Sequence, residues 1–154
     1  MLEGAGVIGI WGNHDVGLAW EPEPTVRQQY SERVLNYMTG LHPRLELEGC
    51  HFSHVEAWLN PHKFEDLWWF DGPPLSVEGL ARNFTAVPQR ILFLGHFHRW
   101  LLTTPQEVLP WRGEAQIRLD PNQRYLIVVH AVWDGHCALF DTVRGELMPF
   151  GCAG

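Results

Sequence analysis

Two short apolar runs, each followed at once by a glycine and polar residues, constrain the fold of this chain most strongly. Residues 7–11 precede Gly12-Asn13-His14-Asp15, and residues 91–94 precede Gly95-His96-Phe97-His98. Each run is typical of a buried β-strand, so each motif is expected in a loop at a strand end. Open α/β sheets bind ligands at that edge. Because Asn and His offer neutral O and N ligands, the motifs predict a divalent-metal site there.

Composition narrows the class of protein. A length of 154 residues suits one domain, and 45% hydrophobic residues with eight Trp favour a globular chain. The net charge of −7 argues against general nucleic-acid binding or attachment to an anionic membrane. It leaves a phosphate ester in a metal site open, because bound cations can dominate the local charge.

Localisation is predicted from three further features. The sequence has no apolar stretch of the roughly 20 residues that span a bilayer, and no signal peptide opens it. The three cysteines, Cys50, Cys137 and Cys152, are odd in number and lack CxxC spacing. They are typical of reduced thiols in a cytoplasmic protein without a membrane partner.

The pattern along the chain predicts a mixed α/β fold. Helices are expected from Thr25 to Thr39, over 63–70 and from Ser76 to Thr85. Strands are expected at the two apolar runs and at seven further segments: 45–49, 50–55, 99–104, 115–119, 125–132, 137–141 and 146–150. Helices and strands followed by a run of strands suit a two-sheet sandwich flanked by helices.

The two motifs, in this order and each after an apolar run, resemble those of the calcineurin-like metallophosphoesterase family, whose members carry GNH[DE] and GHxH. The resemblance covers most of the chain. It implies an αββα two-sheet sandwich with metals at the strand ends. It also implies a hydrolase that cleaves a phosphomonoester or phosphodiester with water activated by a dinuclear metal site.

The resemblance assigns a role to each matching residue. Asn13 and His96 would bind the second metal, and His98 the first. His14 would protonate the leaving oxygen, with Asp15 orienting its imidazole. Arg99 could reach a substrate phosphate, although a solvated charge is the alternative.

The family also has a lone histidine between the two motifs. His54 is our choice for this second-metal ligand, because it ends a predicted strand. The family usually has Gly after that histidine, whereas Val55 follows here. His51 is the rival; three residues apart on a strand, the two would face opposite sides.

Two upstream parts of the family pattern, D-x-H and G-D-x-x-D, do not precede Gly12. The sequence therefore predicts an N-terminally incomplete sandwich, with residues 1–154 as a single partial metallophosphoesterase domain. The complete site would hold two divalent ions (Mn, Fe, Zn or Ni). This chain alone, without carboxylate ligands, would hold Mn or Mg poorly and could hold one Zn or Ni ion.

Three interpretations of the chain stay open. It is part of a phosphoesterase that is inactive as this truncated chain, a non-catalytic metal-binding or oligomerising remnant, or one half of a split phosphoesterase. The corresponding partners are a phosphate-ester substrate, a second copy in a homodimer, and a complementing N-terminal polypeptide. The missing strands would leave an exposed sheet edge, which favours pairing with another chain.

Overall fold

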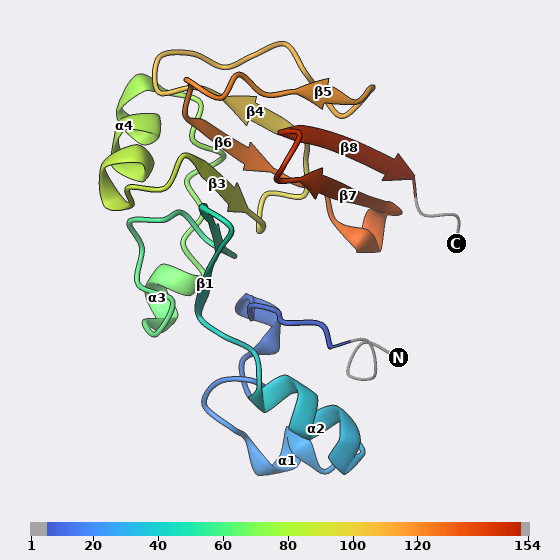
Figure 1. Cartoon of the computed structure of the whole chain (residues 1–154). Helices are drawn as coiled ribbons and strands as arrows, with labels where there is room; N and C mark the ends of the chain where they lie inside the picture. Colours follow the sequence, from blue (N-terminus) through green and yellow to red (C-terminus); the bar gives the residue numbers. More distant parts are fainter. Residues whose placement is uncertain (1–5, 152–154) are drawn as a thin grey trace.

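The computed structural model describes residues 6–151 and forms two β-sheets with helices outside them (Figure 1). The large sheet has the order β1-β2-β3-β6-β4, with bounds Arg44–Leu47, Cys50–Ser53, Ile91–Leu94, Tyr125–Val128 and Leu101–Thr103 in that order. The small sheet has the order β5-β8-β7, with bounds Ile117–Arg118, Glu146–Gly151 and His136–Asp141. The predicted α/β class with two sheets is confirmed.

Four α-helices and two short 3-10 helices complete the described chain. Their bounds are α1 (Pro24–Arg27), α2 (Glu32–Thr39), α3 (Phe64–Leu67), α4 (Val77–Ala86), η2 (Asn13–Asp15) and η3 (Val132–Asp134). Helix α4 starts where the sequence predicts, because the Ser76 side chain accepts a hydrogen bond from Gly79 N at 3.1 Å. In this part of the chain, no helix has the length and apolar character needed to cross a membrane.

Parallel pairing at the centre of the large sheet places three strand ends side by side. Strand β3 pairs in parallel with both β2 and β6. In that register Leu94 lies opposite Ser53 on one side and Val128 on the other. The residues that follow β2 and β3, which are His54 and Gly95, therefore emerge at the same edge of the sheet.

Each face of the large sheet carries its own hydrophobic core. Alternate residues of β3 divide between them, as expected for a strand buried on both faces. Ile91 and Phe93 join the core between the sheets, whereas Leu92 and Leu94 join the core under α4. The predicted strand at 91–94 is confirmed as β3.

Several predicted boundaries are wrong. The run 7–11 is not a strand: only Ile10 pairs, through an isolated bridge to His42, because no neighbouring strand continues alongside it. The helix predicted from Thr25 to Thr39 is two helices, since Ser31 caps a new helix by accepting from Val34 N. The helix predicted at 63–70 covers only α3, and the strand predicted to reach residue 132 ends at Val128.

The structure describes two of the three cysteines. Cys50 is buried and Cys137 is half-buried, and neither forms a disulfide. Cys152 lies outside the described residues.

Candidate metal centre

Two neutral donors from separate segments, Asn13 and His96, lie close to the ring of His54. Asn13 comes from η2, His54 directly follows β2, and His96 follows β3. His54 Nε2 lies 2.8 Å from Asn13 Oδ1 and 3.3 Å from His96 Nδ1. Ligands at 2.0–2.1 Å from a tetrahedral Zn²⁺ are about 3.3 Å from one another. The distances from His54 Nε2 to the other two atoms are therefore close to those between ligands of a single ion.

The first glycine of each motif leaves room for the His54 ring. A Cβ atom on Gly12 would lie 2.6 Å from His54 Nδ1, and one on Gly95 would lie 3.1 Å from the same atom. The first distance is a clash and the second is a tight contact. The lack of a side chain therefore lets the main chain at Gly12 and at Gly95 approach the His54 ring closely.

Burial keeps the two histidines of this cluster neutral. It is the main cause that lowers the pKa of His54 to about 4, and the nearby His96, His14 and His98 lower it further. Burial also lowers the pKa of His96, against an opposing contribution from the Trp69 main chain. Since metals bind the neutral imidazole, both rings are in the ligand form at pH 7.

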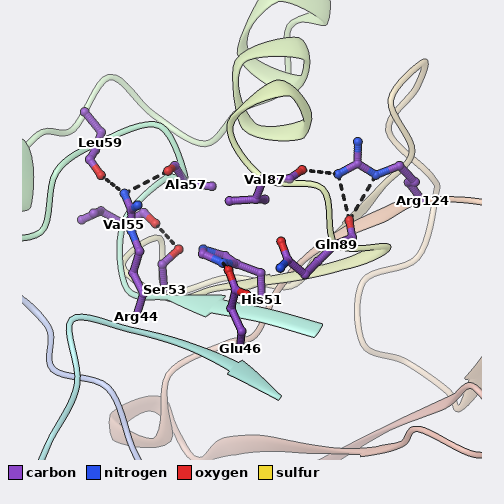
Figure 2. Close-up of polar contacts among 10 residues, drawn as sticks. All are labelled: Arg44, Glu46, His51, Ser53, Val55, Ala57, Leu59, Val87, Gln89 and Arg124. Carbon is purple, nitrogen blue, oxygen red and sulfur yellow. Dashed lines mark hydrogen bonds and ion pairs between the residues drawn. The ribbon is translucent and has the colours of Figure 1, made fainter. Parts of the chain in front are cut away.

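The chain after His54 is held by side chains of β1 and β2. Figure 2 shows the Arg44 guanidinium donating to the carbonyl oxygens of Ala57, at 2.9 Å, and of Leu59. The Ser53 hydroxyl donates to Val55 O at 2.8 Å. These bonds fix the loop that begins at His54, so they also limit where its ring can lie.

His51, the alternative to His54, lies away from the converging donors. It is buried within β2, and its Nδ1 is 3.8 Å from the Glu46 carboxylate of β1 (Figure 2). Desolvation by burial is the main cause that lowers its pKa. Of the two candidates, His54 is the one that the structure brings to Asn13 and His96.

The Gly95–His98 segment is a tight turn in the loop that follows β3. His96 and His98 have φ angles of +62° and +47°, which non-glycine residues rarely adopt. Phe97 N donates to Gly95 O at 2.7 Å, and the Phe97 side chain is buried in the core under α4. The buried phenylalanine and the tight turn therefore determine where the two histidines lie, and such backbone strain is common at functional sites.

His98, the predicted ligand of the first metal, lies beside a carboxylate instead of the three donors. Its Nδ1 is 3.4 Å from Asp134 Oδ2, and His130 Nδ1 is 3.5 Å from the same oxygen. No motif in the sequence marks Asp134, and its spacing of four residues after His130 is the one available signal. His130 Nδ1 also accepts a hydrogen bond from Ala131 N at 2.9 Å, and its ring lies 4.4 Å from that of His136 between centroids.

The predicted catalytic pair is close to the cluster but is not arranged as expected. His14 is exposed and makes an edge contact with Trp68 at 5.4 Å between ring centroids. Asp15 Oδ2 accepts from Gly12 N at 2.7 Å, so the hydrogen bond it forms is to the main chain and not to the His14 ring. Arg99 is exposed. The roles of these three residues stay predictions.

The donor set determines which metal fits. Within residues 6–151, no group of three or more His, Cys, Asp or Glu side chains could hold a metal ion. The cluster instead has two histidines and an amide oxygen, without any carboxylate. Such neutral donors fit one Zn²⁺ or Ni²⁺ ion, and they do not fit Mn²⁺ or Mg²⁺, which prefer hard oxygen ligands.

Comparison with solved structures relates the fold of this chain to a known one. No protein-family model and no curated protein matches the sequence. Among solved structures, the crystal structure of a metallophosphoesterase from Sphaerobacter thermophilus matches with a TM-score of 0.71 and 20% sequence identity. The match covers 96% of this chain and 66% of that one, so this chain spans just under two thirds of its length. The fold is therefore metallophosphoesterase-like.

Proposed function

We propose that this chain takes part in metal-dependent phosphoester hydrolysis and that Asn13, His54 and His96 hold one divalent ion. The observation that carries the proposal is the convergence of their donor atoms, with His54 Nε2 at 2.8 and 3.3 Å from the other two. The metallophosphoesterase-like fold supports it. Bound there, the ion would polarise a phosphoryl oxygen and lower the pKa of a coordinated water.

The chain's own residues would act around that ion. His14 would donate a proton to the leaving oxygen of a phosphomonoester or phosphodiester, a role open to an exposed imidazole beside the cluster. His98 would contribute to a second metal in the complete site, and Arg99 would bind a phosphate oxygen. Two exposed aromatic residues lie beside the cluster: Trp68 contacts His14 and Phe70 contacts His96. They would limit the access of water to the bound ion.

The neutral donor set favours a second candidate function. With no carboxylate in the cluster, the ion would keep its full positive charge, and hard ions such as Mn²⁺ would bind weakly. Catalysis with two ions would then need carboxylates from a complementing polypeptide, as in a split phosphoesterase. Without it, the chain would be a non-catalytic metal-binding protein.

Zinc titration tests the proposal. We expect one Zn²⁺ per chain by calorimetry, and a loss of about 100-fold in affinity, or about 2.7 kcal/mol, in His96→Ala or Asn13→Ala. His42→Ala, which removes an exposed imidazole outside the cluster, should leave zinc affinity unchanged. Equal affinity in His96→Ala and the parent chain would refute the site.

A second assay separates the two functions. Hydrolysis of bis-p-nitrophenyl phosphate is measured with zinc, manganese or nickel added. Turnover that disappears in His14→Ala would support the catalytic proposal. Zinc binding without turnover would support the non-catalytic one.

A further inference from the structure

A small polar cavity lies between the loop that follows β2 and the start of helix α4. Its volume is about 160 Å³, roughly the space of five water molecules. Its lining residues come from three segments: residues 56–58, residues 69–74 and the first turns of α4. The proposed metal ligands Asn13, His54 and His96 are not among them. The cavity is therefore a separate place in the fold.

One charged side chain in the cavity wall is buried and fixed in position. Glu56 is 8% exposed, and its Oε2 accepts a hydrogen bond from Nδ2 of the fully buried Asn83. The same Asn83 amide nitrogen also donates to Gly79 O at 3.0 Å, and its Oδ1 accepts from Ala57 N at 2.8 Å. Because an amide nitrogen has two hydrogens, Asn83 has no donor left for the second oxygen of Glu56.

That second oxygen, Glu56 Oε1, receives no hydrogen bond from any residue in the range 6–151. Glu56 lines the cavity. A carboxylate oxygen removed from bulk water costs free energy unless it is hydrogen-bonded. The cavity therefore suits an occupant that donates a hydrogen bond, and a charged donor forms the stronger bond to a carboxylate.

The other charged residues of the cavity wall also favour a cation. Asp71 and Glu78 line the cavity with Glu56, and Arg82 is the one basic residue among its lining residues. Three carboxylates and one guanidinium leave a formal charge of two negative. In the described part of the chain, Arg82 forms no ion pair with these carboxylates and lies instead over the Trp58 ring, 5.4 Å from its centroid.

Two tryptophans form the aromatic part of the wall. The Trp58 and Trp69 rings meet edge to face, with 6.5 Å between centroids and 74° between planes. Indole faces attract cations, as the position of Arg82 over Trp58 illustrates. Both rings are partly exposed, at 37% and 46%, so a solute can reach the cavity from their side.

The start of α4 offers no competing anion site. Its Gly79 N–H faces the Ser76 hydroxyl, which accepts from it at 3.1 Å. Both residues line the cavity. Because this donor is already bonded, the unpaired group that the cavity presents is the acceptor of Glu56.

We propose that this cavity binds a small organic cation, a primary alkylammonium group. One ammonium N–H would donate to Glu56 Oε1, and the alkyl carbons would lie against Trp58 and Trp69. The proposal rests on the cavity wall and does not depend on a metal at Asn13, His54 and His96.

NMR titration of the parent chain tests the site, in EDTA and without any phosphoester. The probes are butylammonium, the neutral 1-butanol and the anion butyrate, which have similar lengths and differ in charge. Binding is followed by the side-chain indole N–H signals of Trp58 and Trp69. We expect butylammonium to shift both signals with a Kd of about 1 mM. We expect 1-butanol to bind about tenfold more weakly or less, and butyrate not to bind.

A matched pair of substitutions tests the role of Glu56. Glu56→Gln removes the charge with little change in shape and should weaken butylammonium binding by about tenfold or more. Glu65→Gln removes the same charge from an exposed position of α3 outside the cavity and should leave binding unchanged. Thermal melting shows whether both variants fold. The comparison of the three probes on the parent chain needs no variant.

Four results would overturn the proposal: similar binding of butylammonium and 1-butanol, tighter binding of butyrate, equal affinity of Glu56→Gln and the parent chain, or no shift of either indole signal. Since no metal is present, failure here leaves the zinc titration of the proposed function unaffected, and the reverse is also true.

Discussion

At the scale of single residues, the site depends on two glycines. Gly12 and Gly95 have no side chain, and the His54 ring fills the space that their Cβ atoms would need. Asn13 and His96 directly follow these glycines, so the same two positions bring both remaining donors to His54. The glycine of each motif is therefore as necessary to the geometry as the donors.

Gly12→Ala should disrupt the cluster. Its Cβ would lie 2.6 Å from His54 Nδ1, so either the ring or the η2 turn must move. We expect a loss of about 1–3 kcal/mol in the free energy of unfolding, as in other overpacked sites, and weaker zinc binding. Urea unfolding and zinc calorimetry measure the two effects. Gly151→Ala is the control, because a Cβ there meets no atom within 4 Å; equal effects of both substitutions would contradict the interpretation.

The buried His54 should also make the metal-free chain sensitive to acid. Burial is the main cause that lowers its pKa from 6.5 to about 4. Between these two pH values the unfolded chain binds more protons than the folded one, so the free energy of unfolding falls as the pH drops. The loss reaches about 3 kcal/mol at the acidic end.

Urea unfolding in EDTA between pH 4 and 7.5 measures this dependence. In His54→Gln, the free energy of unfolding should change less with pH over that range than in the parent chain. Other buried histidines should keep part of the pH dependence. The same slope in both proteins would show that His54 is not the responsible group.

The site residues differ in how far the sequence could predict them. His54 and His96 could be predicted to meet, because β2 and β3 end at one sheet edge. Asn13 follows the run 7–11, which is not a strand, so its approach to His54 did not follow from the predicted sheet. The orientation of His98 could not be predicted, since it depends on a left-handed φ angle and on Asp134, which is distant in sequence. The hydrogen bond from Gly12 N to the Asp15 carboxylate could not be predicted either, because it depends on the conformation of the η2 turn.

At the scale of elements, one arginine joins α4 to the start of β3. Arg124 donates to Phe84 O at 2.8 Å, to Val87 O at 2.6 Å and to Gln89 O at 2.8 and 3.1 Å. Figure 2 shows the bonds to Val87 and Gln89. These carbonyl groups lie at the end of the helix and in the turn before β3, where no main-chain N–H is in place to bond them. The Arg124 side chain supplies the missing donors.

Arg124→Met should therefore cost about 3 kcal/mol of unfolding free energy, because buried carbonyls lose charged donors. Urea unfolding measures the loss. Arg118→Met, at an exposed position of β5, is the matched control and should change stability by less than about 0.5 kcal/mol. A similar small change in both variants would show that water replaces the Arg124 bonds.

Elements with local signals could be predicted and those that need a distant partner could not. Helix α4 has a serine cap and an apolar stripe within ten residues, and β3 is a short apolar run. The run 7–11 has the same apolar character as β3, but it stays unpaired except at Ile10 because a strand requires neighbours along its length. The break between α1 and α2 arises from Ser31, which competes as a cap inside the predicted helix.

At the scale of the whole molecule, the large sheet belongs to both main cores. The core between the sheets and the core under α4 include alternate residues of the same strands, such as Phe93 and Leu92 of β3. If these strands separate, both cores therefore lose residues at the same time. That residues 1–154 form a single domain stays a prediction.

Hydrogen exchange tests how cooperative the molecule is. Every residue of β3 and β6 is buried, whereas α1 and α2 contain no buried residue and project from the two sheets (Figure 1). Amides of β3 and β6 should exchange only by global unfolding, and those of α1 and α2 by local opening at a much smaller free energy. If the chain is one domain, amides of β8 in the small sheet will share the opening free energy of β3. A lower value for β8 would mean that the small sheet opens separately, and that the core between the sheets does not couple them.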